Sequence, residues 1–198
     1  MRVKSHWFKS GRAKSPQEIA SAVAFISWRA SDHALKSTRR AGFDIAVGEQ
    51  YFSFLSEFLI FLIQVADRIA YRQFDEEDRI AFTTAAANRA GEILADNKAE
   101  YLGADLRACK ADFIARLNAR AEEYAMFEYE KGGENFSFIR ALGLSLQDVM
   151  DERDRKWVTD QVMAIEAPEA VATLEKAMAG LLELEPHAPR RGGHASGE

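Results

Sequence analysis

Residues 54–74, FLSEFLIFLIQVADRIAYRQF, are the most apolar segment of the chain, yet they contain Glu57, Gln64 and Arg68. At 100° per residue on a helical wheel, these three side chains fall within one narrow stripe, with Tyr71 at its edge. Aromatic and aliphatic side chains occupy the rest of the circumference. A helix that is apolar around most of its circumference packs against neighbours on most sides. We therefore expect this segment to form the central helix of the fold, with one polar seam along it.

Helical patterning continues through the rest of the chain. The interior between Pro16 and Pro168 contains no proline and is rich in Ala, Leu, Glu and Arg, which favour helix. No segment alternates apolar and polar residues over six or more positions, and the Asn-Gly and Asp-Gly pairs typical of hairpins are absent. We expect an all-α fold, an antiparallel helical bundle of six to seven helices, in which the first four form the bundle and the others a C-terminal helical annex. The predicted helices cover residues 16–40, 48–73, 75–97, 103–131, 135–142, 145–166 and 168–183.

The chain divides into one domain and two extensions. A chain of 198 residues normally folds as one domain with its own core. Ser15, Pro16 and Glu18 form a capping box with a first-turn proline, which marks the start of the first helix. The predicted parts are a basic flexible arm over 1–14, a single helical domain over 15–184, and a disordered tail rich in Pro, Gly and His over 185–198.

Charge is distributed unevenly along the chain. The net charge is −5, but residues 1–40 contain nine Lys and Arg against two Asp and Glu. The arm Arg2–Lys14 adds Trp7 and Phe8 to its basic residues, a mixture that can bind phosphate backbones or anionic lipid surfaces. The arm is short and has no amphipathic helix, so we expect it to dock on the bundle or on a second copy. We do not expect it to bind nucleic acid or an anionic membrane.

Signals for a compartment or a cofactor are few. Cys109 is the single cysteine, which excludes an intramolecular disulfide and fits a reducing cytoplasm. The N-terminal basic residues are not followed by an apolar region, and no stretch approaches the ~20 apolar residues of a membrane span. No Glu is followed three residues later by His, and no zinc-type spacing occurs. We expect a cytoplasmic protein with no metal and no cofactor.

The polar seam provides the candidate site. The preceding helix carries His33 on its apolar face, flanked by Arg29, and the short link between the two helices makes them antiparallel neighbours. We therefore expect Glu57 to meet Arg29 or His33 across this helical hairpin. Three interpretations stay open: a structural ion cluster that fixes helix register, a seam that faces solvent or an oligomer contact, and a polar pocket for a small ligand. Such a pocket would be lined by Arg29, His33, Glu57, Gln64, Arg68 and Tyr71.

Two functional hypotheses follow from these observations. No phosphate-binding glycine loop or nucleophile elbow occurs, and aromatic residues crowd the middle of the chain. We therefore expect a non-enzymatic, cytoplasmic protein-interaction module that forms a homodimer through an aromatic-rich helical face. The alternative is a small-ligand-binding or enzymatic helical bundle, with its polar pocket between the first two helices. The sequence assigns no catalytic residue in either case.

Overall fold

A computed structural model describes residues 14–182. Every regular element in this range is helical and the helices pack against one another, which confirms the predicted all-α helical bundle. The basic arm, apart from Lys14, and the tail over 185–198 lie outside the described residues. The elements are α1 (Pro16–Arg40), α2 (Glu49–Tyr71), α3 (Glu76–Leu102), α4 (Leu106–Tyr124), α5 (Phe136–Gln147), α6 (Glu152–Gln161), a π-helical turn η1 (Val162–Glu166) and α7 (Ala167–Leu181).

Local sequence signals set several of the helix ends. The Ser15 hydroxyl accepts from the Glu18 N–H at 3.2 Å, and the Glu18 carboxylate accepts from the Ser15 N–H at 2.9 Å, which confirms the predicted capping box. The third helix was predicted to end near Asn97, but the Asn97 side chain donates to the Ile93 carbonyl within α3 and the helix continues. It ends only before Gly103, whose φ of 68° is the left-handed conformation that glycine adopts easily.

The boundaries of α4 and α5 differ from the predicted ones. α4 ends at Tyr124 and not near Lys131, and α5 extends to Gln147. Ser145, where the sixth helix was predicted to begin, is therefore an interior residue of α5. Its buried hydroxyl donates to the Ala141 carbonyl at 3.0 Å, so the side chain is satisfied inside the helix.

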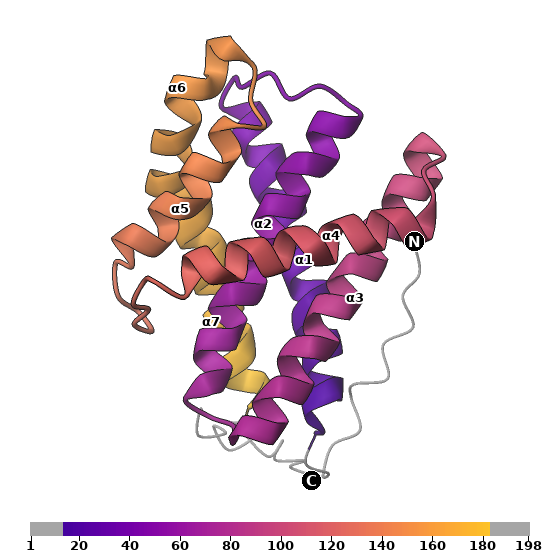
Figure 1. Cartoon of the computed structure of the whole chain (residues 1–198). Helices are drawn as coiled ribbons and strands as arrows, with labels where there is room; N and C mark the ends of the chain where they lie inside the picture. Colours follow the sequence, from indigo (N-terminus) through magenta and orange to yellow (C-terminus); the bar gives the residue numbers. More distant parts are fainter. Residues whose placement is uncertain (1–13, 183–198) are drawn as a thin grey trace, which may run out of the picture.

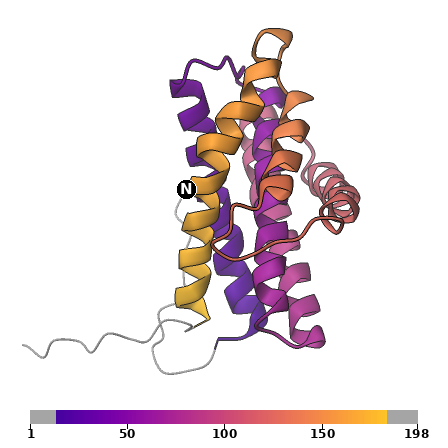
Figure 2. The ribbon, with the colours of Figure 1, turned by 90° about the vertical axis from the view of Figure 1, so that its left-hand side faces the viewer.

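Most helices run along the length of the molecule, and α4 crosses them. α1, α2, α3 and the run from α6 to α7 lie lengthwise, with consecutive members in opposite directions (Figure 1). α4 passes across α2 and α3, and Figure 2 shows it nearly end-on beside the upright helices. The fourth lengthwise member is thus α7, which packs on α1 and α2, and not α4 as predicted. α4 buries only Phe113, Leu117 and Tyr124, which is too little apolar surface for a bundle core position.

The predicted central helix is confirmed. All side chains from Phe54 to Ala66 are buried, and α2 contacts α1, α3, α4, α5 and α7. The ring of Phe61 lies 6.2 Å from that of Tyr124 and 5.9 Å from that of Phe138, so an aromatic cluster joins α2 to α4 and α5. Tilted ring pairs at such distances stabilise a core beyond the area they bury. Even with so apolar a centre, none of the helices within residues 14–182 is long and apolar enough to cross a membrane.

Gly143 of α5 packs directly against Thr159 of α6, and it supplies a test of this packing. A Cβ at residue 143 would lie 2.8 Å from the Thr159 Cγ2 atom. We expect Gly143→Ala to lower the free energy of unfolding by about 1 kcal/mol, because overpacking at about 1–3 kcal/mol outweighs a gain of about 1 kcal/mol in helix propensity.

Thr159→Ser is the matched background for this substitution. It removes the clashing methyl group but keeps the hydroxyl that donates to the Gly143 carbonyl at 3.2 Å. In that background Gly143→Ala should become neutral or stabilising in urea unfolding. An equal loss of stability in both backgrounds would show that Thr159 does not limit the approach of the two helices.

Candidate functional site

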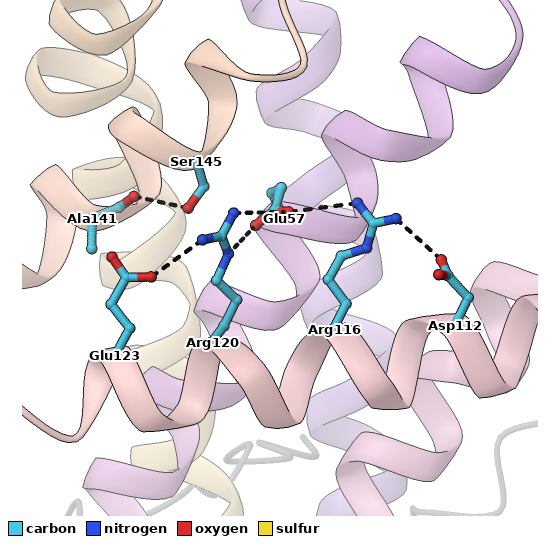
Figure 3. Close-up of polar contacts among 7 residues, drawn as sticks. All are labelled: Glu57, Asp112, Arg116, Arg120, Glu123, Ala141 and Ser145. Atoms are coloured by element: carbon cyan, nitrogen blue, oxygen red, sulfur yellow. Dashed lines mark hydrogen bonds and ion pairs between the residues drawn. The ribbon is translucent and has the colours of Figure 1, made fainter.

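Glu57 lies at the crossing of α2 and α4, where two arginines of α4 reach it (Figure 3). The Arg120 guanidinium donates to both carboxylate oxygens, from Nε at 3.2 Å and from Nη2 at 3.5 Å. Arg116 Nη1 lies 3.8 Å from Glu57 Oε1. Each arginine also pairs with an acidic residue of its own helix, Arg120 with Glu123 and Arg116 with Asp112, both at 3.2 Å.

This cluster holds α4 on α2. Glu57 is only 4% exposed, and a buried carboxylate is costly unless it is paired and hydrogen-bonded. Burial lowers the pKa of the Arg120 guanidinium, but the hydrogen bond and charge of Glu57 outweigh burial and raise that pKa above its ordinary value. Arg120 therefore stays charged, and both Glu57 oxygens are occupied. Of the three interpretations of the seam, this geometry matches the structural ion cluster.

A second residue of the predicted seam, Arg68, also contacts α4. Arg68 Nη2 donates to the Tyr124 carbonyl at the end of α4 at 2.8 Å. Gln64, on the same face of α2 between Glu57 and Arg68, is 9% exposed. Tyr71 lies at the exposed end of α2, where the Arg79 guanidinium stands 4.9 Å from its ring centre. The polar contacts of the seam residues Glu57 and Arg68 are therefore with α4.

Arg29 and His33 do not take part in this cluster, contrary to the prediction. Both are exposed on α1, on the side of that helix that borders α7. The prediction put His33 on the apolar face of this helix, but the buried face of α1 is centred on Ser27, which is fully buried, and is made largely of small residues. Small side chains let neighbouring helices approach closely, so this face is buried although its residues are not strongly apolar. Arg29 and His33 lie outside this buried face and are exposed.

A groove of about 410 Å³ lies between α1 and α7, and it brings Arg29 and His33 together. We call it the α1–α7 groove. The small side chains of Ala30, Ala34 and Ala170 leave room between the two helices. The groove is bordered by Phe25, Ile26, Arg29, His33, Glu166, Glu169 and Thr173.

Glu166 is the chemically unusual member of the α1–α7 groove. Its side chain is 1% exposed. One carboxylate oxygen, Oε1, accepts from Gln161 Nε2 at 2.9 Å. The other, Oε2, is buried and has no hydrogen-bond partner among residues 14–182. Nearly all buried polar groups in proteins have a partner, so an unpaired carboxylate oxygen requires an explanation.

The π-helical turn η1 explains how Glu166 comes to face the groove. Pro168 has no N–H to donate and its ring crowds the carbonyl four residues earlier, which disrupts a regular α-helix. The chain was predicted to start a new helix at Pro168, but it continues from α6 to α7 through a wider turn, in which the Ala167 N–H bonds to the Val162 carbonyl. Such turns bring residues five apart closer to one face, and they occur frequently at functional sites.

Sequence reasoning did not identify Glu166. The available signal was the proline two residues later, inside a segment that otherwise reads as one long helix. Its groove combines the positive charge of Arg29 and the imidazole of His33, which can donate and accept hydrogen bonds, with two carboxylates, Glu166 and Glu169. Within the described part of the chain, no group of three His, Cys, Asp or Glu side chains is placed to hold a metal ion. The groove therefore has the chemistry to bind an organic ligand by hydrogen bonds and charge.

The Glu57 cluster predicts unequal effects for its two arginines. Arg120→Met keeps the aliphatic stem but leaves a buried carboxylate with a single distant cation, so we expect a loss of about 3 kcal/mol in the free energy of unfolding. Arg116→Met should lose less than about 1 kcal/mol, because this side chain is 39% exposed and 3.8 Å from Glu57. Urea unfolding of both variants measures the difference. Equal losses would show that Arg120 is not the principal partner of Glu57.

Comparison of the chain with protein-family models, curated proteins and solved structures gave no match.

Proposed function

We propose that the protein binds a small polar metabolite in the α1–α7 groove. The observation that carries the proposal is the unpaired, buried Oε2 atom of Glu166 beside this groove. An unsatisfied buried acceptor costs about 1–3 kcal/mol, and more when it is charged. An N–H or O–H group of a ligand would supply the missing hydrogen bond.

The side chains of α1 on the wall opposite Glu166 indicate which chemical group the other end of the ligand carries. Arg29 on α1 presents a guanidinium, whose planar set of N–H donors matches carboxylate and phosphate groups. His33, one turn further along α1, adds a donor or an acceptor beside it. The ligand class supported by these groups carries an ammonium or hydroxyl donor for Glu166 and an acidic group for Arg29. A volume of about 410 Å³ lies within the range of small-molecule sites.

Access to Glu166 requires movement at the rim of the groove. Glu166 is 1% exposed, so a ligand reaches Oε2 only when neighbouring side chains move aside. Arg29, His33 and Thr173 at the rim are exposed, and exposed side chains change rotamer within nanoseconds or faster. We expect rotamer changes of these rim side chains to open the way to Oε2.

The homodimeric, non-enzymatic interaction module and its cytoplasmic location stay predictions. The many aromatic residues in the middle of the chain were the reason to predict an interaction module. Several of them pack inside one chain, since Phe54, Phe58 and Phe61 are fully buried in the core. Enzymatic activity in the groove also stays open as an extension of ligand binding. We place ligand binding ahead of these alternatives because Glu166 has a buried carboxylate oxygen without a hydrogen-bond partner in the described range 14–182.

A thermal-shift screen tests the proposal. The probes are α-amino acids, hydroxy acids and amino sugar phosphates, with polyamines and simple dicarboxylates as ligands that lack one of the two groups. We expect at least one probe that has both groups to raise the unfolding temperature by several degrees. At one hundred times Kd a ligand contributes about 2.7 kcal/mol, which corresponds to roughly 5–11 °C for a chain of this size.

Three variants locate the effect in the groove. Arg29→Ala and Glu166→Gln should each abolish most of the shift, whereas Arg40→Ala, an exposed arginine of α1 outside the groove, should retain it. Without ligand, Glu166→Gln should unfold at about the same temperature as the wild type, because the amide oxygen can still accept from Gln161 Nε2 and the second polar atom lacks a partner among the described residues in both proteins. The proposal is wrong if no probe gives a shift, or if the shift persists in both groove variants.

A further inference from the structure

A second hollow, separate from the α1–α7 groove, lies where α1, the start of α2 and the end of α3 meet. Its volume is about 440 Å³. Four aromatic side chains line it, Trp28 from α1, Tyr51 and Phe52 from α2 and Tyr101 from α3, together with the carboxylate of Asp32 from α1. We call these five residues and the space between them the aromatic hollow.

The rings of the aromatic hollow face in different directions. The Tyr51 and Phe52 ring centres are 5.4 Å apart with planes at 73°, and those of Phe52 and Tyr101 are 6.4 Å apart at 45°. Phe52 is 5% exposed and fixed in the core, whereas Tyr101 is 71% exposed and stands at the mouth. These rings are therefore tilted relative to one another and not stacked.

Asp32 places a carboxylate on the wall of the aromatic hollow, and Lys36, which also lines the hollow, pairs with it. Asp32 Oδ1 accepts from the Tyr51 hydroxyl at 3.2 Å, and Asp32 Oδ2 pairs with Lys36 at 2.7 Å. Burial, and then the charge and hydrogen bond of Asp32, raise the pKa of Tyr51, so its hydroxyl stays protonated and keeps donating to the carboxylate. Lys36 is 61% exposed, and an exposed pair one helical turn apart is weak. A ligand cation can therefore replace Lys36 beside Asp32 while the Lys36 ammonium stays in water.

We propose that the aromatic hollow binds an organic cation of the methylated-ammonium class. The negative face of an aromatic ring attracts a cation, and sets of aromatic rings recognise quaternary ammonium groups in this way. A methylated ammonium also presents apolar methyl groups to the rings. Because water solvates it less strongly than a primary ammonium, its transfer from water into the hollow costs less free energy. Asp32 adds direct charge complementarity at one wall. The proposal does not depend on the α1–α7 groove, because none of the five residues of the hollow borders that groove.

Amide chemical shifts in NMR titrations test the proposal on the full chain. The probes are tetramethylammonium, choline and phenyltrimethylammonium, and the neutral isostere of choline, 3,3-dimethylbutan-1-ol, is the control ligand. We expect at least one cation to shift the resonances of residues that line the hollow, and the neutral alcohol to bind about tenfold more weakly than choline or not at all. The proposal is overturned if no cation shifts these resonances at tens of millimolar, or if the alcohol binds as well as choline.

Variants at the mouth and wall of the hollow complete the test. Tyr101→Ala and Asp32→Asn should each weaken binding of the cation several-fold, and Tyr101→Phe, which keeps the ring, should bind like the wild type. Tyr71→Ala removes an exposed tyrosine outside the hollow and should have no effect. Because Tyr101 is largely exposed, Tyr101→Ala should fold normally, and its unperturbed spectrum elsewhere would verify this. Unchanged affinity in Tyr101→Ala would overturn the proposal.

Discussion

The buried ion pair between Glu57 and Arg120 fixes how the chain is assembled. A carboxylate buried in the most apolar helix is costly unless a cation pairs with it, and the helix that carries this cation lies against that face. Here Arg120 of α4 supplies it across a sequence separation of 63 residues, at the point where α4 crosses the bundle. Phe61, Tyr124 and Phe138 then pack beside the pair and close the core around it.

Because Arg120 of α4 pairs with Glu57, the charged residues of α1 are not needed at that carboxylate. Because α1 is buried through small residues around Ser27, its larger and charged side chains point towards its two open flanks. Arg29 and His33 border the α1–α7 groove on one flank, and Trp28 and Asp32 border the aromatic hollow on the other. Both proposed ligand sites are thus consequences of how one helix is packed.

The features that could be predicted from sequence are those that depend on neighbouring residues. The apolar run in 54–66 identified the central helix, and Ser15 with Glu18 marked the start of α1. The need of Glu57 for a cation was also evident, but its partner was not, because a helical wheel carries no information on which distant helix faces the seam. Glu166 was not predicted for a similar reason. Its burial and its unpaired oxygen depend on a π-helical turn and on the packing of α1 beside that turn.

A double-mutant cycle between Glu57 and Arg120 is the most direct test of the central claim. The single changes Glu57→Gln and Arg120→Met, and their combination, are measured by urea unfolding, with a parallel cycle between Glu57 and Arg29. The structure predicts a coupling energy of about 1–3 kcal/mol for Glu57 with Arg120, and none beyond about 0.5 kcal/mol for Glu57 with Arg29. Coupling of Glu57 to Arg29, without coupling to Arg120, would contradict the arrangement of α1, α2 and α4 described above.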